Sequence, residues 1–427
     1  MSNSASFEAY FSFLHSKGLG LQDAMKTVAH WSPSQFIDFQ LTHQERFPYT
    51  RARESEVTIA DFVASRSMSG GRWPCSAMEC RMKRVDQLSR FIALYANQVV
   101  IPSPITLIPP SKLHENTLIE FLNELLVLYA FKPLLEAGLL VVTPSDFNFC
   151  KVHARKMIAL KKKVTQAAKA TIKPNLKKID ITFKRSHGVT EVLFATPEMF
   201  FDHSFHGHVT KTSLRSMQRK SKAQHMLGAM GPAISDVLYQ ILTGNPSYLS
   251  SQEFDFQLIQ HLNKPDAQLT SKALFDGFSH SLPFVRHVPI ARLLELRLQE
   301  GESFKVYRDA VDKSLRIAAK EDVSKIKQLF SDDVLPELNK IDLSIKNSRS
   351  FFAGSAIKDF AVGAGFLGVG LFAGFVPPDV SHCFTALGGY SFVKGAADQI
   401  SDTVRKPRDI RDNKFYFLWK VRDDAHT

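Results

Sequence analysis

Cysteine is scarce in this chain, with four residues among 427. So few cysteines exclude the disulfide framework of a small secreted protein. The first twenty residues contain neither a basic segment nor a continuous apolar run, so they do not match a secretory signal. Both absences favour a reduced, cytoplasmic environment.

Short catalytic and cofactor motifs are missing as well. The chain has no GxxxxGKS or GxxxxGKT loop, no GxSxG turn and no kinase or deaminase signature. Gly363, Gly365 and Gly368 match GxGxxG, but a dinucleotide-binding turn needs a preceding strand and a full following helix, and Pro377 follows too soon. We therefore expect no cofactor and favour a binding protein over an enzyme. Enzyme activity stays open, because the scattered carboxylates of a nuclease leave no motif.

Positive charge is concentrated in one segment. The chain carries 54 Lys and Arg against 42 Asp and Glu, a net charge of +12. Residues 151–225 contain 17 basic and 4 acidic residues, a net of +13, so the rest of the chain sums to −1. Such a local excess is typical of a surface that contacts a polyanion.

The basic segment begins with a predicted amphipathic helix, Lys151 to Ile172, which has apolar residues on one face and cations on the other. No carboxylate lies between Phe147 and Ile179 to relieve repulsion among these cations. Two predicted strands, Ile179 to Arg185 and Thr190 to Ala195, form a basic hairpin after it. These observations predict nucleic-acid binding through Lys151, Arg155, Lys162, Lys163, Lys169, Lys177, Lys178, Lys184 and Arg185.

The kind of nucleic acid is indicated by what accompanies the cations. Phe183 is the only aromatic residue between Lys151 and Gly188. Proteins that bind single strands place aromatic rings among their cations so that bases can stack. The segment also has no zinc-finger, RRM or helix-turn-helix pattern. We therefore expect contacts to the backbone of duplex or structured nucleic acid, without sequence specificity.

A histidine cluster, DHSFHGH, suggests a further hypothesis, a metal-dependent hydrolase that uses His203, His206 and His208. His203 and His206 would share a helical face, whereas His206 and His208 would share a strand face. No single regular element presents all three, so these residues are weak metal candidates.

The predicted fold class is α+β, with helices predominating. Strand, helix and strand patterns at Gln98 to Ile101, Leu118 to Leu135 and Leu139 to Val142 predict a βαβ-like unit. The expected parts are an N-terminal α/β part at 1–150, the basic helix and hairpin at 151–225, a helical region at 226–350, and a Gly-rich helical hairpin with a C-terminal strand at 351–427.

The stretch Phe360 to Pro377 has eighteen residues without a charge and includes five glycines. It predicts a glycine-rich helical hairpin that is either buried in the protein or inserted in a bilayer. An alternative function follows from insertion, namely a membrane-acting effector whose basic face lies on anionic lipid. The run Phe415 to Trp419 predicts a strand or an apolar plug that docks the C-terminal segment.

Two segments carry a resemblance. The residues LELRLQEGESFKVYRDAV, Leu294 to Val311, and YFLWK, Tyr416 to Lys420, resemble segments of uncharacterised bacterial proteins. The resemblance implies a bacterial source. It implies no activity, protein partner or site residue.

Overall fold

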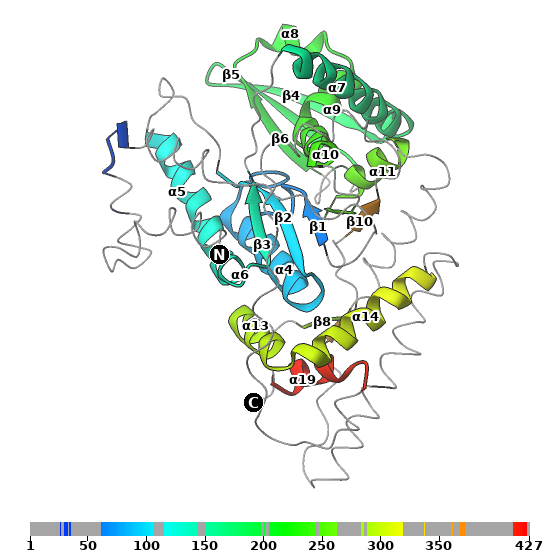
Figure 1. The fold of residues 1–427 in the computed structure, drawn as a ribbon. Helices are drawn as coiled ribbons and strands as arrows, with labels where there is room; N and C mark the ends of the chain where they lie inside the picture. The colour runs from blue at the N-terminus through cyan, green and yellow to red at the C-terminus, as the bar shows by residue number, and fades with distance from the viewer. Residues whose placement is uncertain are drawn as a thin grey trace.

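The computed structural model describes residues 26, 30–32, 34–35, 61–105, 115–143, 151–197, 200, 205–243, 247–250, 252–262, 283–285, 288–318, 337, 360–362, 368–371 and 413–424. The chain is mostly helical and contains a small parallel sheet, which agrees with the predicted α+β class. Figure 1 shows the parallel sheet in the middle, one group of helices and strands above it and a second helical group below it.

The central sheet has the strand order β10-β7-β1-β2-β3. Strands β7, β1, β2 and β3 are parallel, and β10 pairs with β7 in the antiparallel direction. Strands β2 and β3 are parallel neighbours, and α5 and α6 connect them in the chain, so the predicted βαβ-like unit is present. The bounds are Asp61–Ala64 (β1), Met78–Tyr95 (α4), Gln98–Pro102 (β2), Glu115–Ala130 (α5), Lys132–Glu136 (α6), Leu140–Thr143 (β3), Ser247–Ser250 (β7) and Gly368–Leu371 (β10).

Helices cover both faces of the parallel sheet. Val63, Val100 and Val141 are neighbours in register on β1, β2 and β3, and they form a small cluster with Tyr239 of α10 (Gly231–Thr243). The alternate residues of the same strands belong to the main core with α4 and α5. Burial on both faces explains why these strands are continuous apolar runs in the sequence.

Three helices continue the main core below the sheet: α13 (Ile290–Gln299), α14 (Gly301–Ala318) and α19 (Tyr416–Asp424). The rings of Phe304 and Phe417 lie edge to face, with their centroids 4.9 Å apart. The guanidinium of Arg297 lies 4.2 Å from the centroid of the Phe304 ring. The two segments that resemble bacterial proteins therefore pack against each other.

The upper group has a core of its own, to which Val164, Ala168, Phe194, Val237 and Leu258 contribute. Helix α7 begins and ends where the sequence predicted, and the basic hairpin is present as β4 and β5. The elements of this group, together with α10, are Lys151–Ile172 (α7), a 3-10 helix at Lys173–Lys178, Asp180–Ser186 (β4), Val189–Ala195 (β5), Phe205–Thr210 (β6), Leu214–Gln218 (α8), Lys222–Ala229 (α9) and Glu253–Leu262 (α11).

The region 226–350 is not wholly helical as expected, because it contains β7 and the short strand β8 (Pro283–Val285). Strand β7 has only four residues, and its partner β1 lies far away in the chain. Neither local periodicity nor composition marks so short a strand, since parallel pairing depends on distant residues. The strand β1 was not predicted either, because it also has only four residues and pairs with strands that are distant in the chain.

The predicted glycine-rich helical hairpin is wrong where the structure describes it. Residues Phe360–Val362 form β9, which pairs with β8, and Gly368–Leu371 form β10, which pairs with β7. Glycine disfavours strands as well as helices, so tertiary pairing decides the conformation here. Within the described part of the chain, no helix is long and apolar enough to cross a membrane. Insertion of residues 360–377 stays a prediction.

The predicted C-terminal strand is a helix, α19. Its residues Phe417, Leu418 and Trp419 are all buried, as is Phe415 just before it. A run that is apolar on every side has no periodicity to distinguish a helix from a strand. The expected docking of this segment is correct, but its conformation is not.

Gly70 tests how tightly the loop after β1 packs. Its φ is +72°, and a Cβ there would lie 2.6 Å from Val127 Cγ1 and from Val85 Cγ2. We expect Gly70→Ala to lower the free energy of unfolding by about 2–4 kcal/mol, because backbone strain and overpacking add. Gly138, with φ +69° and no atom within 4 Å of the added Cβ, is the matched control. Gly138→Ala should lower the free energy of unfolding by only about 1 kcal/mol. If urea denaturation shows the same loss for both variants, the packing argument is wrong.

Candidate functional site

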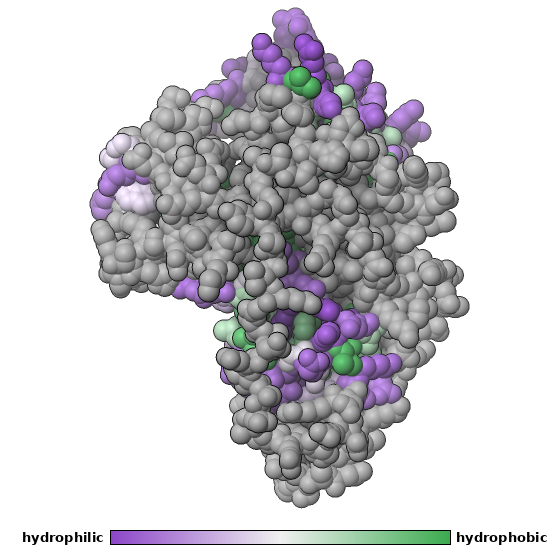
Figure 2. Space-filling view, viewed as in Figure 1, coloured by the Kyte–Doolittle hydropathy of each residue, from purple (hydrophilic) through white to green (hydrophobic). Residues whose placement is uncertain are grey.

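All nine cations predicted to bind nucleic acid are solvent-exposed. They lie on the upper group of elements, where Figure 2 shows hydrophilic residues gathered along the top edge of the molecule. We call the exposed Lys and Arg side chains of residues 151–222 the basic surface. The remaining exposed cations of this surface are Lys161, Lys173, Lys211, Arg215, Arg219, Lys220 and Lys222.

Helix α7 presents the first part of the basic surface. Leu160, Val164 and Ala168 bury one side of the helix in the upper core. The opposite side therefore faces solvent, and Lys151, Arg155, Lys162 and Lys169 lie along it at intervals of one or two turns. Ile158 lies among these cations and is 69% exposed, which is unusual for isoleucine.

The 3-10 helix and the hairpin supply the second part. Lys177 and Lys178 are exposed at the end of the 3-10 helix, and Lys184 and Arg185 near the end of β4. Lys184 pairs with Glu191 in the strand register, so a carboxylate lies on its neighbouring strand. Lys222 donates a hydrogen bond to the carbonyl oxygen of Ile179 at 2.6 Å and reaches Asp180 Oδ1 at 3.5 Å. Lys222 is therefore engaged within the protein.

The described residues add no support to the hypothesis of a histidine metal site. His203 lies outside them, whereas His206 and His208 belong to β6 and pair with Phe194 and Val192 of β5. The described part of the chain contains no group of three or more His, Cys, Asp or Glu side chains that could hold a metal ion. A histidine metal site stays a prediction.

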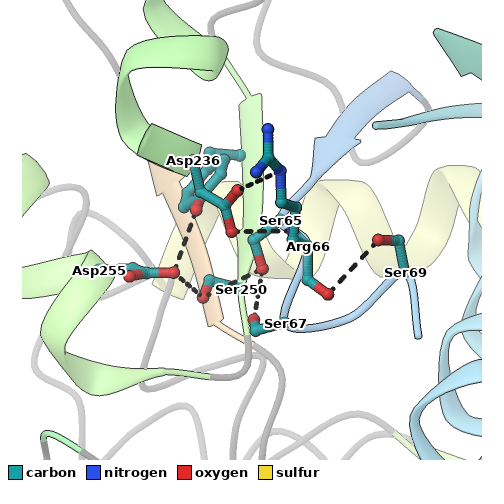
Figure 3. Close-up of polar contacts among 8 residues, drawn as sticks. Ser65, Arg66, Ser67, Ser69, Asp236, Ser250 and Asp255 are labelled. Carbon is teal, nitrogen blue, oxygen red and sulfur yellow. Dashed lines mark hydrogen bonds and ion pairs between the residues drawn. The ribbon is translucent and has the colours of Figure 1, made fainter. Parts of the chain in front are cut away.

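A second polar site lies at the carboxyl ends of β1 and β7, and the sequence did not reveal it. Along the chain, β2 and β3 follow β1 on one side, whereas β7 joins β1 on the other side. The strand order therefore reverses between β1 and β7. Four elements contribute polar residues here, and we call the set the switch-point cluster (Figure 3): Ser65, Arg66, Ser67, Ser69, Asp236, Tyr248, Ser250 and Asp255.

Asp236 of α10 fixes the loop that follows β1. The backbone N–H of Arg66 donates a hydrogen bond to Asp236 Oδ2 at 2.9 Å, and Arg66 Nε lies 3.2 Å from Asp236 Oδ1. Burial raises the pKa of Asp236 to about 7, although Arg66 opposes this shift. The Asp236 side chain is 1% exposed and that of Arg66 is 32% exposed, so the pair extends from the interior to the surface.

Asp255 of α11 holds the end of β7. Its Oδ2 accepts hydrogen bonds from Ser250 Oγ at 2.7 Å and from the Tyr248 hydroxyl at 3.1 Å. Burial, and then the charge of Asp236, raise the pKa of Asp255 to about 8, so this carboxyl is largely protonated at neutral pH. Its other oxygen, Oδ1, is buried and has no hydrogen-bond partner among the described residues. Leaving such an atom unpaired costs about 1–3 kcal/mol.

The loop between β1 and α4 is held in place from below by two buried arginines. Arg81 Nε donates to the carbonyl oxygen of Gly70 at 2.6 Å, and Arg84 Nη2 donates to those of Gly71 and Cys75 at 2.9 and 2.8 Å. Two positive charges therefore lie under a loop of serines and glycines. The sequence signal was the loop itself, Ser69 to Gly71, but without β1 its place at a strand end could not be recognised.

The two raised pKa values predict how stability depends on pH. An acid whose pKa is higher in the folded than in the unfolded state loses its contribution as pH rises through the folded value. The free energy of unfolding should therefore fall between about pH 4 and pH 8, by up to about 1.4 kcal/mol per pH unit for each carboxyl. Asp255→Asn imitates the neutral acid at every pH. The free energy of unfolding of this variant, relative to that of the wild type, should therefore rise by at least about 1 kcal/mol between pH 5 and pH 9.

Urea denaturation at several pH values measures this difference. Asp309→Asn is the control, because that carboxyl is 63% exposed on α14 and is not in the cluster. Parallel pH profiles for the wild type and Asp255→Asn would show that Asp255 ionises normally in the folded protein.

Comparisons with known proteins add no activity to this geometry. No protein-family model, curated protein or solved structure matches the chain. Function must therefore follow from the chemistry of the basic surface and of the switch-point cluster.

Proposed function

We propose that this protein binds duplex or structured nucleic acid through the basic surface, by contacts to the phosphate backbone and without sequence specificity. The observation that carries the proposal is the exposure of all nine predicted cations on one group of elements. Exposed cations of one sign repel one another, and phosphates relieve that repulsion while releasing condensed counterions.

The dimensions of α7 suit a duplex. Its 22 residues span about 33 Å, which is close to the 34 Å or so of one turn of B-form DNA. Cations along one side of such a helix can follow the phosphates of one groove edge. The exposed Ile158 lies between Arg155 and Lys162 on the same side of α7 and would add an apolar contact to the bound nucleic acid.

Single-stranded nucleic acid fits the surface less well. Phe183 is the only aromatic residue of the segment Lys151 to Gly188, and its ring lies 5.1 Å from the ring of His225 in the upper core. A single, partly buried ring that packs against His225 is a poor platform for stacked bases. Backbone contacts to a duplex therefore account for the surface better than base stacking.

Charge reversal tests the proposal directly. Replacing Lys151, Arg155, Lys162, Lys163 and Lys169 by Glu should weaken binding to duplex DNA or RNA by about a hundredfold or more at low salt, because phosphate contacts become repulsions. Fluorescence anisotropy with a labelled 20-base-pair duplex measures the dissociation constant. Circular dichroism should show an unchanged fold, because exposed cations contribute little to stability.

A charge-matched control separates site from net charge. Lys162→Glu with Lys169→Glu changes the net charge as much as Lys83→Glu with Lys305→Glu, two exposed cations on α4 and α14. Only the first pair should weaken duplex binding. Equal loss in both double variants would mean that net charge, and not the basic surface, determines binding.

Salt dependence gives a second, independent prediction. If about five phosphates are neutralised, the logarithm of the association constant should fall with the logarithm of salt concentration with a slope of about −4.5. The Lys162→Glu, Lys169→Glu variant should show a slope shallower by about 2. A wild-type slope near zero would contradict backbone binding.

Binding to an anionic membrane is the alternative function of the basic surface. Vesicles of neutral phosphatidylcholine, and vesicles with anionic phosphatidylserine added, should be tested by flotation beside the duplex. Binding to anionic vesicles without binding to any duplex would replace the proposed function by the membrane-acting alternative. Retention by neutral vesicles would in addition support insertion of residues 360–377.

A further inference from the structure

The geometry points to a nucleotide-binding site at the switch-point cluster, in which the loop after β1 holds a phosphate and Asp255 holds a hydroxyl of the ribose. This site is separate from the basic surface, and the inference does not rest on the proposed function. The ligand class is a ribose phosphate, carried by a nucleotide.

The position of the cluster is the first argument. Where the strand order of an open parallel sheet reverses, the loops leaving the two neighbouring strands diverge and form a crevice at their carboxyl ends. In this sheet the reversal lies between β1 and β7, and the parallel pairing of Val63 with Tyr248 and of Ala64 with Leu249 places both carboxyl ends together. Ser65 to Ser69 follow the end of β1 directly, and Ser250 is the last residue of β7.

The loop after β1 suits a phosphate. Ser65, Ser67 and Ser69 place three hydroxyl groups in this loop, where they bond to one another and to the carbonyl oxygen of Arg66. Hydroxyls, backbone amides and a guanidinium are the usual partners of phosphate oxygens.

The charges around this loop favour an anion. Around this loop the guanidiniums of Arg66, Arg72, Arg81 and Arg84 outnumber the carboxylates of Asp236, Glu120 and Glu124 by one. The raised pKa values of Asp236 and Asp255 reduce the negative charge further. Arg81 is 2% exposed, and its Nη2 has no hydrogen-bond partner in the described part of the chain. A buried guanidinium without a full set of acceptors gains free energy when an anion binds nearby.

Asp255 Oδ1 requires a partner that can both donate and accept a hydrogen bond. Oδ2 already accepts from Tyr248 and Ser250, so a proton on the neutral acid resides on Oδ1 and that atom donates. When the acid ionises, the same atom accepts. A hydroxyl group satisfies either state, and a ribose offers hydroxyls next to a phosphate. Figure 3 shows Asp255 pointing from α11 towards Ser250 and Asp236 pointing towards Arg66. Asp236 therefore contacts the loop after β1 directly, whereas Asp255 is linked to it through the hydrogen bond between Ser250 and Ser65.

Isothermal titration calorimetry on the full chain tests the site. The probes are AMP, ATP and NAD⁺, with ribose 5-phosphate, 2′,3′-dideoxy-AMP and inorganic phosphate as comparisons. We expect saturable binding of AMP or a larger nucleotide, with dideoxy-AMP weaker by about tenfold because the contact to Asp255 is lost. Binding of ribose 5-phosphate as tight as AMP would keep the ribose-phosphate site but show that the base is not recognised.

Variants assign the binding to these residues. Asp255→Asn and Arg66→Ala should each weaken binding of AMP by about tenfold. Arg292→Ala is the control and should not, because Arg292 lies on α13 and pairs with Glu295 outside the cluster. Because Arg66 and Asp255 also support the fold, the dideoxy-AMP comparison provides a test on the unaltered protein. No binding of any nucleotide, equal binding of AMP and dideoxy-AMP, or binding of inorganic phosphate as tight as that of AMP would overturn the inference.

A variant at one site should not change binding at the other site. Lys162→Glu with Lys169→Glu should leave AMP binding unchanged, because both residues lie on the solvent side of α7. Arg66→Ala should leave duplex binding unchanged. Loss of AMP binding in the α7 variant would show that the nucleotide binds to the basic surface instead, which would refute a switch-point site.

Discussion

The parallel pairing of β1 with β7 is the contact on which the rest of the structure depends. It joins residues about 185 positions apart, and the backbone N–H of Ser65 extends it with a hydrogen bond to the carbonyl oxygen of Leu249 at 2.8 Å. Leu249 belongs to the main core, whereas its neighbour Tyr248 belongs to the upper core. Because successive side chains of a strand point to opposite faces, this one short strand contributes side chains to both cores.

Helix α10 strengthens the same junction. Tyr239 covers the valines of the parallel sheet, Val237 and Leu238 pack into the upper core, and Asp236 binds the loop after β1. A buried carboxyl is tolerated only when hydrogen bonds or a cation compensate for lost hydration. The contact of Asp236 with Arg66 supplies both, so the polar junction is specific in a way that apolar packing alone is not.

Local patterns predicted the parts of the fold that repeat a period. Helix α7 has an apolar face every 3.6 residues, and the β4–β5 hairpin lies between clear turn residues, so both appear at the predicted positions. Strands β7, β9 and β10 have three or four residues each, and their partners are distant, so no local signal exists. The basic surface followed from charge alone. The switch-point cluster did not, because Asp236 and Asp255 resemble ordinary helix residues until β1 and β7 are placed side by side.

Exposure determines what each site can recognise. The cations of α7 are surrounded by water, so their attraction to phosphates is long-ranged, weakly selective for shape and strongly screened by salt. Asp255 Oδ1 is removed from water, so only a directional hydrogen bond with a small group that enters the site can satisfy it. A ligand held by such a bond depends less on ionic strength than a polyanion on the surface. Raising the salt concentration should therefore release nucleic acid from the basic surface while a nucleotide stays bound at the strand ends.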